Sequence, residues 1–279
     1  MSDEPERSDD DGDPFPIEPD VPRLARIRNA ISGGDANFSA DRTVVKELAD
    51  AAPSGLEGLQ AVLEALHRFK ARAVRTVAAE SGIRQFLHIG TATSSTGMVH
   101  EQLRPLVPGS RVVYASYDTT TLAHVHDLWR DAPEGAVAHV HSRFEDPERI
   151  LSGAAETLDL DDPIAALLPT SLNVLSDEDA QGLVDALRGA LVSGSYLVVA
   201  ETSLDIYAEG TAEVVEVLNA ALEEPYIARS RSAIAHQLEA FDLIEPGLVP
   251  VEHWRNDGDP PFLPEGQLVP LFAAVGRKP

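Results

Sequence analysis

The residues best placed to do chemistry lie in a loop that follows an apolar run at 85–89. This run contains His88 and leads directly into Gly90 and Thr91. A glycine at such a position lets the backbone turn tightly against a ligand. The loop lacks the further glycines of a dinucleotide fingerprint and the lysine of a phosphate-binding loop, so nucleotide triphosphate chemistry is not supported. Alone, it weakly indicates a cofactor-type turn.

Three more polar stretches follow other apolar runs. Ligands of a doubly wound α/β sheet bind beyond the carboxyl ends of its strands, so residues that follow strands are the candidates. The sequence contains no Gly-x-Ser-x-Gly nucleophile elbow. The three stretches are the end of 111–116 with Ser116, Tyr117 and Asp118, the turn 142–146 with Arg143 and Phe144, and the stretch from Pro169 to Asn173.

Two of these candidates have a second explanation. Arg143 can face an anionic ligand, or form a surface ion pair with Glu145 or Asp146. Asn173 can position a substrate, or cap the turn before Ser176.

The histidines suggest a further alternative. His88 can contact a ligand or be a buried, hydrogen-bonded residue. His139 and His141 are two residues apart in a predicted strand and share a face, with His124 and His126 on the preceding predicted helix. Imidazole is a common metal ligand, but no carboxylate motif frames this set. We therefore predict structural histidines and no metal site.

The candidates require a scaffold in which short apolar runs alternate with helical segments. Such runs form right-handed βαβ units and a parallel sheet, whose buried strands are apolar throughout. The predicted strands are 85–89, 111–116, 136–141, 164–168, 195–200, 243–251 and 268–276. The predicted helices are 97–106, 119–131, 147–155, 177–192, 209–222 and 230–239. The predicted fold class is doubly wound α/β.

The segment before this scaffold has a different pattern. Residues 1–20 hold nine acidic residues against one arginine, so they cannot bury enough apolar surface and are expected to be a disordered tail. A glycine pair that begins at Gly33 ends a short helical segment. Ser39 is predicted to cap the next helix, and 56–81 form a long helix with apolar residues at helical spacing.

Composition excludes several classes of function. The chain has 279 residues, no cysteine and a formal net charge of −24. It therefore has no disulfide, thiolate metal site or cysteine nucleophile, and its charge repels nucleic acids and anionic membranes. No apolar run approaches the ~20 residues of a membrane helix, and the acidic N-terminus does not resemble a signal peptide. We expect a cytoplasmic protein that binds neither nucleic acid nor membrane.

Several strings, in order over about residues 21–279, resemble one family. It is the S-adenosylmethionine-dependent methyltransferase family common in actinobacteria. The strings are GGDANFSADR (33–42), GIRQFLHIGT (82–91), GMVHE (97–101), RVVY (111–114), DPERIL (146–151), GSYL (194–197), EPGLVP (245–250), WR (254–255) and AVGRKP (274–279).

This resemblance implies a class I methyltransferase fold that uses S-adenosylmethionine. The implied sheet has seven strands, mostly parallel, with a last antiparallel strand from 268–276. A helical lid from 21–80 would cover the cofactor, over a Rossmann-like core from 85–279. The implied cofactor-binding residues are Gly33, Asn37, His88, Gly90, Thr91, Ser116, Tyr117, Asp118, Arg143, Phe144 and Pro169.

The chain departs from the family pattern at these positions. His88 stands where the first strand typically ends in an acid, and Ala92 replaces the second glycine of that loop. Ser116 replaces the diol-binding acid, and Arg143 replaces the adenine-side acid. A lost charged hydrogen bond costs about 1.5–3 kcal/mol, so three such losses would amount to roughly three to six decades of affinity.

Three hypotheses follow. The first is a small-molecule methyltransferase with altered cofactor contacts, because methyl transfer needs mainly alignment and desolvation rather than a catalytic triad. The second is a pseudo-methyltransferase with weak or absent cofactor binding, which serves as a binding or regulatory module as a homodimer or with an active relative. The third is a repurposed enzyme with another ligand in the same cleft. The sequence identifies neither a catalytic residue nor the substrate.

Overall fold

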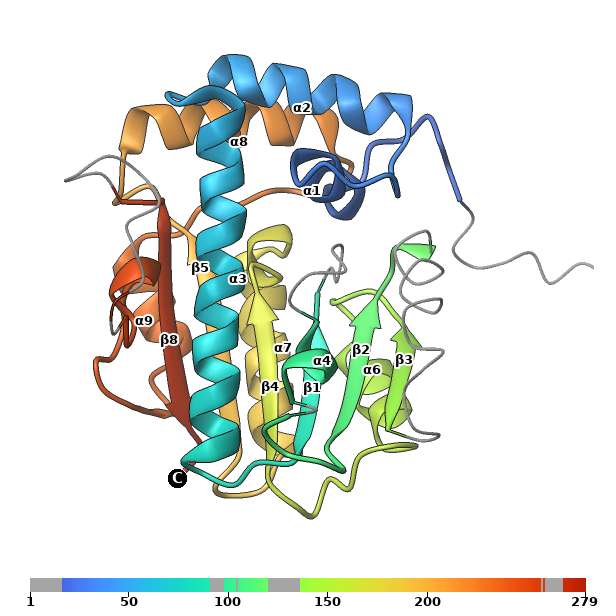
Figure 1. Cartoon of the computed structure of the whole chain (residues 1–279), viewed down its shortest axis with the longest axis vertical. Coiled ribbons are helices and arrows are strands. Elements are labelled where there is room, and N and C mark those ends of the chain that lie inside the picture. The colour runs from blue at the N-terminus through green and yellow to red at the C-terminus, as the bar shows by residue number, and fades with distance from the viewer. Residues whose placement is uncertain (1–16, 91–97, 104, 120–135, 257, 259–267) are drawn as a thin grey trace, which may run out of the picture.

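The apolar runs of the sequence form the strands of one sheet. The computed structural model describes residues 17–90, 98–103, 105–119, 136–256, 258 and 268–279. Its eight strands follow the order β3-β2-β1-β4-β5-β8-β6, with β7 also paired to β8 (Figure 1). They are β1 (Gln85–Ile89), β2 (Arg111–Ser116), β3 (Val137–His141), β4 (Ile164–Pro169), β5 (Tyr196–Thr202), β6 (Asp242–Leu243), β7 (Val249–Pro250) and β8 (Leu271–Arg277).

Strands β1 to β5 are parallel, and β8 runs antiparallel to β5. The mostly parallel sheet with an antiparallel last strand is thus confirmed. The single strand predicted over 243–251 is wrong. The described residues form two short strands there, so the sheet has eight strands and not the expected seven. The predicted strand is interrupted because Gly247 turns the chain with a φ of 81° and donates its N–H to the carbonyl of Ile244 at 2.8 Å. The separated ends are the short strands β6 and β7, both paired to β8.

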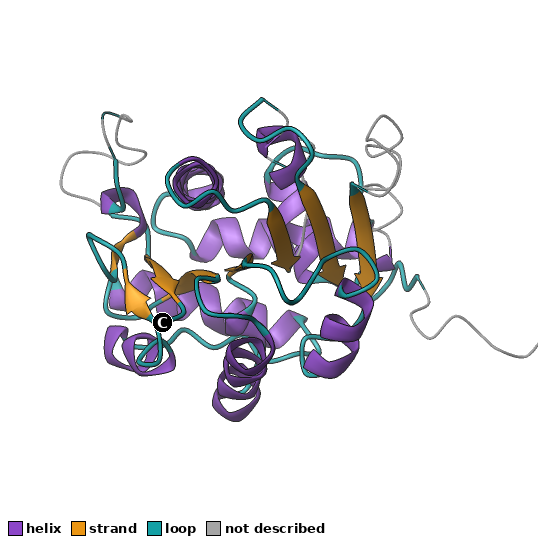
Figure 2. Cartoon of the chain, turned by 90° about the horizontal axis from the view of Figure 1, so that it is seen from below, coloured by secondary structure: helices purple, strands orange, loops and turns teal. Residues whose placement is uncertain are grey.

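Helices cover both faces of the sheet (Figure 2). The sheet has a hydrophobic core on each face. Because side chains alternate along β1, Phe86 packs into one core, and Leu87 and Ile89 pack into the other. The first core is covered by α3 (Gly55–Ala79) and α4 (Val99–Leu103). The second is covered by α6 (Pro147–Ala154), α7 (Asp177–Ala190) and α9 (Arg231–Gln237).

A third group of helices lies beyond the carboxyl ends of the strands (Figure 1). It consists of α1 (Leu24–Ile31), α2 (Ser39–Ala51) and α8 (Ala208–Ala221), together with the beginning of α3. We call these elements the cap. The rest of α3 leaves the cap and packs on the sheet through buried side chains between Ala65 and Ala78. One long helix therefore connects the cap to the core.

A buried ion pair joins the first two helices of the cap. Arg26 Nε lies 3.2 Å from Asp41 Oδ2, and the two side chains are 2% and 0% exposed. The same carboxylate accepts the N–H groups of Arg23 at 3.0 Å and Phe38 at 2.8 Å. The prediction that Ser39 caps α2 is therefore wrong. Ser39 is the first residue of that helix, and Asp41 reaches back to the residue before it.

Other predicted elements are found with small shifts, and two segments lie largely outside the described residues. The helix predicted over 97–106 is the shorter α4. The helix predicted over 119–131 falls almost wholly outside the described residues, as does most of the predicted tail at 1–20. No helix in the part of the chain that the structure describes is long and apolar enough to cross a membrane.

Candidate functional site

The carboxyl end of β1 is packed tightly under the loop that follows β4. Gly90 has a φ of 145°, and a Cβ on it would lie 2.7 Å from Ser171 Oγ, closer than real Cβ contacts occur. Ser171 donates its hydroxyl to the carbonyl of Ile89, and the Gly90 N–H donates to the carbonyl of Ala115 at 3.0 Å. Glycine is required at position 90 because its φ is positive and because the Cβ of any other residue would clash with Ser171. Thr91 lies outside the described residues.

The ends of β2 and β3 bring together four of the predicted site residues. The rings of Tyr117 and Phe144 meet edge to face, with centroids 5.2 Å apart. The hydroxyl of Ser116 accepts the backbone N–H of Asp118 at 3.3 Å, and both residues are buried. Burial and nearby carboxylates raise the pKa of Tyr117, so this residue is a neutral aromatic surface. The group offers aromatic rings beside one carboxylate.

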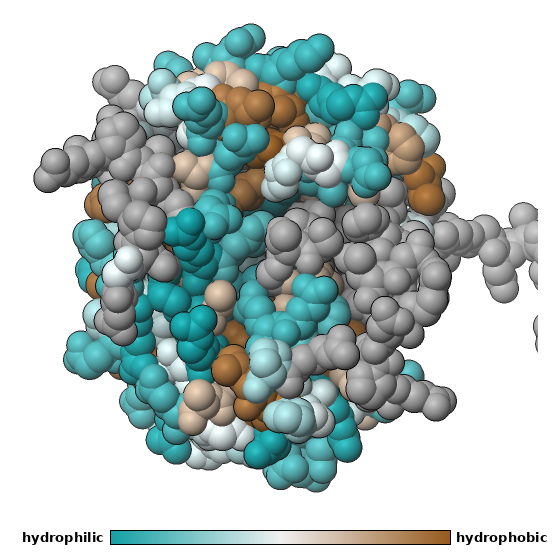
Figure 3. Space-filling view, viewed as in Figure 1, coloured by the Kyte–Doolittle hydropathy of each residue, from teal (hydrophilic) through white to brown (hydrophobic). Residues whose placement is uncertain are grey.

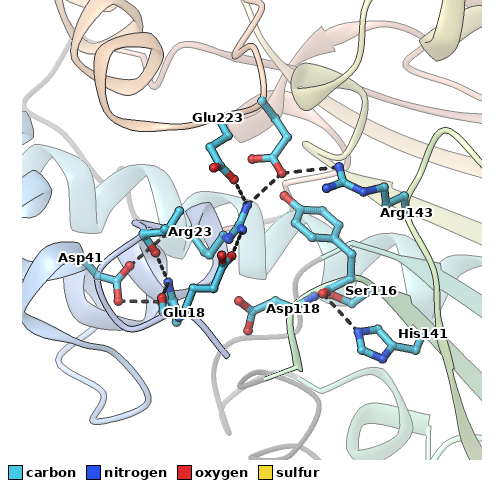
Figure 4. Close-up of polar contacts among 12 residues, drawn as sticks. Glu18, Arg23, Asp41, Ser116, Asp118, His141, Arg143 and Glu223 are labelled. Atoms are coloured by element: carbon cyan, nitrogen blue, oxygen red, sulfur yellow. Dashed lines mark hydrogen bonds and ion pairs between the residues drawn. The ribbon is translucent and has the colours of Figure 1, made fainter. Parts of the chain in front are cut away.

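An ion-pair network crosses this end of the sheet (Figure 4). Arg23, just before α1, lies 2.6 Å from Glu18, 2.9 Å from Glu223 and 3.2 Å from Glu224. On the other side Arg143 lies 3.7 Å from the same Glu224. The cap is thereby connected to the turn after β3.

Arg143 forms the ion pair that the sequence left open, but with a different acid. Its partner is Glu224, and its guanidinium also lies 5.9 Å from the centre of the Tyr117 ring. Asp146, one of the expected partners, instead caps α6 by accepting the N–H of Arg149 at 3.0 Å. The partner was not predictable because it follows α8, far away in the sequence.

Gly33 and Asn37 build the turn between α1 and α2. Gly33 has a φ of 76° just after α1 ends. Asn37 Nδ2 donates to Asn29 Oδ1 at 2.9 Å and to the carbonyl of Gly34 at 2.8 Å, while its Oδ1 accepts from Arg42 at 2.9 Å. The polar groups of Asn37 are thus engaged in shaping the cap.

Asn173 does not cap the turn before Ser176, which was one of its two expected roles. It belongs to the short 3-10 helix η1 (Leu172–Val174) and is fully buried. Its Oδ1 accepts the N–H of Thr202 at 3.0 Å, and its Nδ2 donates to the carbonyl of Ile227 at 2.6 Å. Asn173 therefore ties the ends of β4 and β5 to a distant loop, while Ser176 caps α7 by accepting from Asp179 at 3.1 Å.

A cavity of about 280 Å³ lies between the cap and the carboxyl ends of β4 and β5. We call it the apolar chamber. Figure 3 shows apolar surface gathered near the top of the molecule, where α2, the beginning of α3 and α8 meet. The chamber is lined mainly by aliphatic side chains, among them Leu24, Ile27, Leu59, Val62, Val214 and Leu218, with Thr170, Thr202 and Tyr207 as polar neighbours.

Two residues that line the chamber have left-handed backbones. Thr170 has a φ of 63° and Tyr207 a φ of 51°. Positive φ is a true outlier for a β-branched residue, and such strain gathers at binding sites. The chamber was not predictable from any one stretch of sequence, because its walls come from separate segments between residues 24 and 271.

A smaller polar cavity of about 20 Å³ adjoins the chamber, and we call it the cation pocket. It brings His88 of β1 and Pro169 of β4 next to Lys70 and His67 of α3. The described residues that line it are Arg28, Ser32, Leu63, Leu66, His67, Lys70, His88 and Pro169.

Burial governs the ionisation of this pocket. It lowers the pKa of Lys70 to about 8, which leaves the amine mostly charged at neutral pH. Burial and the charges of Lys70 and Arg28 lower the pKa of His67 to about 4. Burial also holds the pKa of His88 well below its ordinary value. The Nδ1 atom of His88 has no hydrogen-bond partner among the described residues. The pocket combines a cation with neutral imidazoles.

Lys70 and His67 are site candidates that the sequence analysis missed. One signal was present, since Lys70 stands four residues after Leu66 and three before Ala73 on the apolar stripe of the long helix. A lysine on a buried helix face is rare unless it is paired. Helical spacing alone does not show what faces Lys70, because the strand residues next to it lie elsewhere in the sequence.

The described histidines form no metal site. His141 Nε2 lies 3.2 Å from the carbonyl of Tyr117 and 3.3 Å from Thr119 Oγ1. His124 and His126 lie outside the described residues. Across the described ranges there is no group of three side chains suited to hold a metal ion.

The sheet, its antiparallel last strand and the cap over its ligand-binding edge define a class I methyltransferase-like protein. The model of the S-adenosyl methyltransferase family matches residues 11–279, so the chain belongs to that family. The resemblance found in the sequence is confirmed. No curated protein matches the chain.

Two solved structures are similar over nearly their whole length. A candidate methyltransferase from Thermobifida fusca is 31% identical, with 93% of this chain and 96% of that chain covered and a TM-score of 0.81. A DUF574 family protein from Streptomyces avermitilis is 30% identical, with 94% and 99% covered and a TM-score of 0.84. An O-methyltransferase family protein from Burkholderia thailandensis, at 9% identity with 75% and 55% covered and a TM-score of 0.50, shares the fold alone.

Proposed function

We propose that this protein transfers the methyl group of S-adenosylmethionine to a small acceptor molecule whose apolar part occupies the apolar chamber. The chamber itself carries this proposal. It holds about 280 Å³, is lined mainly by aliphatic side chains and opens beside the ends of β4 and β5. Small-molecule sites are apolar cavities with a few polar groups, and this fold binds ligands at that edge of the sheet.

The described residues fit the adenosine part of the cofactor. Asp118 offers a carboxylate at the end of β2, where a ribose diol can donate to it. Tyr117 and Phe144 offer aromatic surface for a base, and Gly90 forms the tight turn at the end of β1 with a φ of 145°. These four residues are the ones we expect to hold the cofactor.

The chemistry requires little from the side chains. When bound, the cofactor supplies a methyl group on a sulfonium. A lone pair of the acceptor would bond to the methyl carbon as the C–S bond breaks with its electron pair on sulfur, and any proton on the acceptor atom would pass to water once the product leaves the chamber. The aliphatic walls around Leu59 and Val214 exclude water and align the acceptor, which is the main contribution to such a reaction.

A second candidate function is a binding or regulatory module without methyl transfer. The observation that favours it is the cation pocket, because His88 and Lys70 occupy the region where the family carries an acid. A cation there repels the ammonium group of the cofactor. Such a module would act as a homodimer or with an active relative.

Calorimetry with S-adenosylmethionine and S-adenosylhomocysteine separates the two functions. Methyl transfer predicts a Kd tighter than about 100 μM, which corresponds to about −5.5 kcal/mol. No heat at millimolar cofactor would support the module. In that case the triple variant His88→Asp, Ser116→Asp and Arg143→Asp should restore binding, because it returns the three acids of the family pattern.

Methyl transfer itself is measured with labelled S-adenosylmethionine and a panel of small apolar acceptors. Val214→Trp fills the chamber from α8, so it should abolish transfer while S-adenosylhomocysteine still binds. Glu216→Trp, on the exposed side of the same helix, is the matched control and should leave transfer unchanged. Equal loss in both variants would contradict the chamber as the acceptor site.

A further inference from the structure

We propose that the acceptor is an apolar carboxylic acid, whose body fills the apolar chamber and whose carboxylate binds Lys70 in the cation pocket. This inference deepens the proposed function and rests on it. It names the chemical class of the acceptor, which the fold and the family leave open.

The two cavities are neighbours with common walls. Arg28, Leu63 and Leu66 line both of them. One molecule can therefore place an aliphatic or aromatic part between the cap helices and extend a polar end toward β1. The polar end would meet Lys70 from α3 and His88 from β1.

The charge of the pocket selects an anion. Lys70 is only 9% exposed, and the described residues that line the pocket include no carboxylate. Burial lowers the pKa of Lys70, and among the described residues that line the pocket no acid offsets the desolvation of the amine. A buried charge without a partner is unfavourable, and a ligand carboxylate would supply the missing partner.

The two histidines of the cation pocket contribute hydrogen-bond donors but no charge. His67 and His88 are neutral at physiological pH, as their lowered pKa values require. A neutral imidazole still carries one N–H. The Nδ1 atom of His88 is buried without a hydrogen-bond partner among the described residues. A carboxylate oxygen in the pocket is the kind of group that could satisfy it.

The size of the pocket narrows the class of anion. Its volume of about 20 Å³ is close to the ~10–15 Å³ needed for one water molecule. One end of a carboxylate is of that size, whereas a phosphate or sulfate group is larger. The apolar chamber next to it is more than ten times as large, so most of the acceptor must be apolar.

A carboxylate can come from two sources, the acceptor or the methionine part of the cofactor. The shared walls favour the acceptor, and the experiment separates the two. Calorimetry with octanoate and 4-phenylbutanoate is compared with their neutral amides, with and without saturating S-adenosylhomocysteine. The variants are Lys70→Met, Lys70→Arg, and Lys46→Met on the exposed side of α2 as the matched control.

We expect the acids to bind about 10- to 100-fold more tightly than the amides, as for one charge-assisted hydrogen bond. Lys70→Met should abolish this preference and leave amide binding unchanged, whereas a purely structural lysine would affect both ligands. Lys70→Arg should keep part of the preference, and Lys46→Met all of it. Circular dichroism verifies that each variant folds, and Lys70→Gln replaces any that does not.

Two results would overturn the inference. One is equal affinity of acids and amides for the unmodified protein. The other is that Lys70→Met weakens S-adenosylhomocysteine binding but keeps the preference for acids, which assigns the pocket to the cofactor. Failure of the proposed function is recognised separately, because the preference for acids is measured without cofactor and without turnover.

Discussion

Arg23 and Glu224 lie 3.2 Å apart and join the beginning of α1 to the segment after α8. The same carboxylate lies 3.7 Å from Arg143 after β3, so one acid connects three segments around the candidate cofactor site. Burial disfavours the charge of Arg23, but the hydrogen bond to Glu18 and the carboxylates of Glu224 and Glu223 outweigh it and raise its pKa. Arg23 therefore keeps its charge at the centre of the network.

Glu224→Gln should loosen the cap. Glu224 is 9% exposed, so its charged contacts are only weakly screened, and their loss should lower the free energy of unfolding by about 1–3 kcal/mol. Urea denaturation measures this value, and hydrogen exchange should show faster opening of α1. Glu223→Gln is the matched control, because this neighbour is 61% exposed and should contribute less than about 1 kcal/mol. Equal effects of both variants would contradict a special role for Glu224.

Lys70→Met should stabilise the ligand-free protein at neutral pH. Burial lowers the pKa of Lys70 from 10.5 to about 8, and each unit corresponds to 1.36 kcal/mol, so the charged lysine costs on the order of 3 kcal/mol. The unfolded chain binds this proton more tightly than the folded one, so the cost is complete below pH 8 and disappears as pH rises to about 10.5.

Denaturation of both proteins between pH 7 and pH 10.5 checks this. The advantage of Lys70→Met should shrink across that range, and a pH-independent difference would mean that the effect is packing alone. Lys46→Met again serves as the control, since Lys46 is exposed and its substitution should change stability little at either pH.

Arg229→Met should strongly destabilise the fold. Arg229 Nη1 lies 3.1 Å from Glu201 Oε2 and also donates to the carbonyl of Leu172 at 2.6 Å, while Glu201 is fully buried. Removal of one partner leaves a buried charge uncompensated, which costs about 3–5 kcal/mol. Thermal and urea denaturation measure the loss.

The control for Arg229 is a surface arginine. Arg188→Met removes an ion pair at 3.8 Å from Asp185 in which both side chains are about half exposed, so it should change stability by less than about 1 kcal/mol. If the two variants were equally stable, the buried pair would not be a structural tie between β5 and the loop after β4.

Gly210→Ala should destabilise the protein and narrow the chamber. A Cβ on Gly210 of α8 would lie 2.3 Å from Pro53 Cγ in the turn between α2 and α3, and both residues line the chamber. Forced overpacking of this kind costs about 1–3 kcal/mol. Gly182→Ala in α7 meets nothing within 4 Å and should instead stabilise by up to about 1 kcal/mol, the ordinary gain for a helix. If Gly210→Ala stabilised the protein, α8 and the turn at Pro53 would have to move apart at little cost in free energy.

Much of the core was predictable because its signals are local. The apolar runs predict β1 to β5 within two residues, and the signal is clearest for β4 and β5, which are buried on both faces and largely apolar. The family strings gave the antiparallel last strand. The turn at Gly90 was predicted from its residue type, and the structure adds the hydroxyl of Ser171 that makes glycine necessary.

The sequence by itself determined the family and the parallel sheet, because these depend on residue type and order along the chain. Through the resemblance it also implied that His88, Ser116 and Arg143 stand where the family carries acids. Only the tertiary structure decided what surrounds those positions. Lys70 meets His88, and Glu224 meets Arg143, across large separations in sequence. The physical reason is that helix packing and sheet order bring distant segments together, and no periodicity within one segment records which partners they will be.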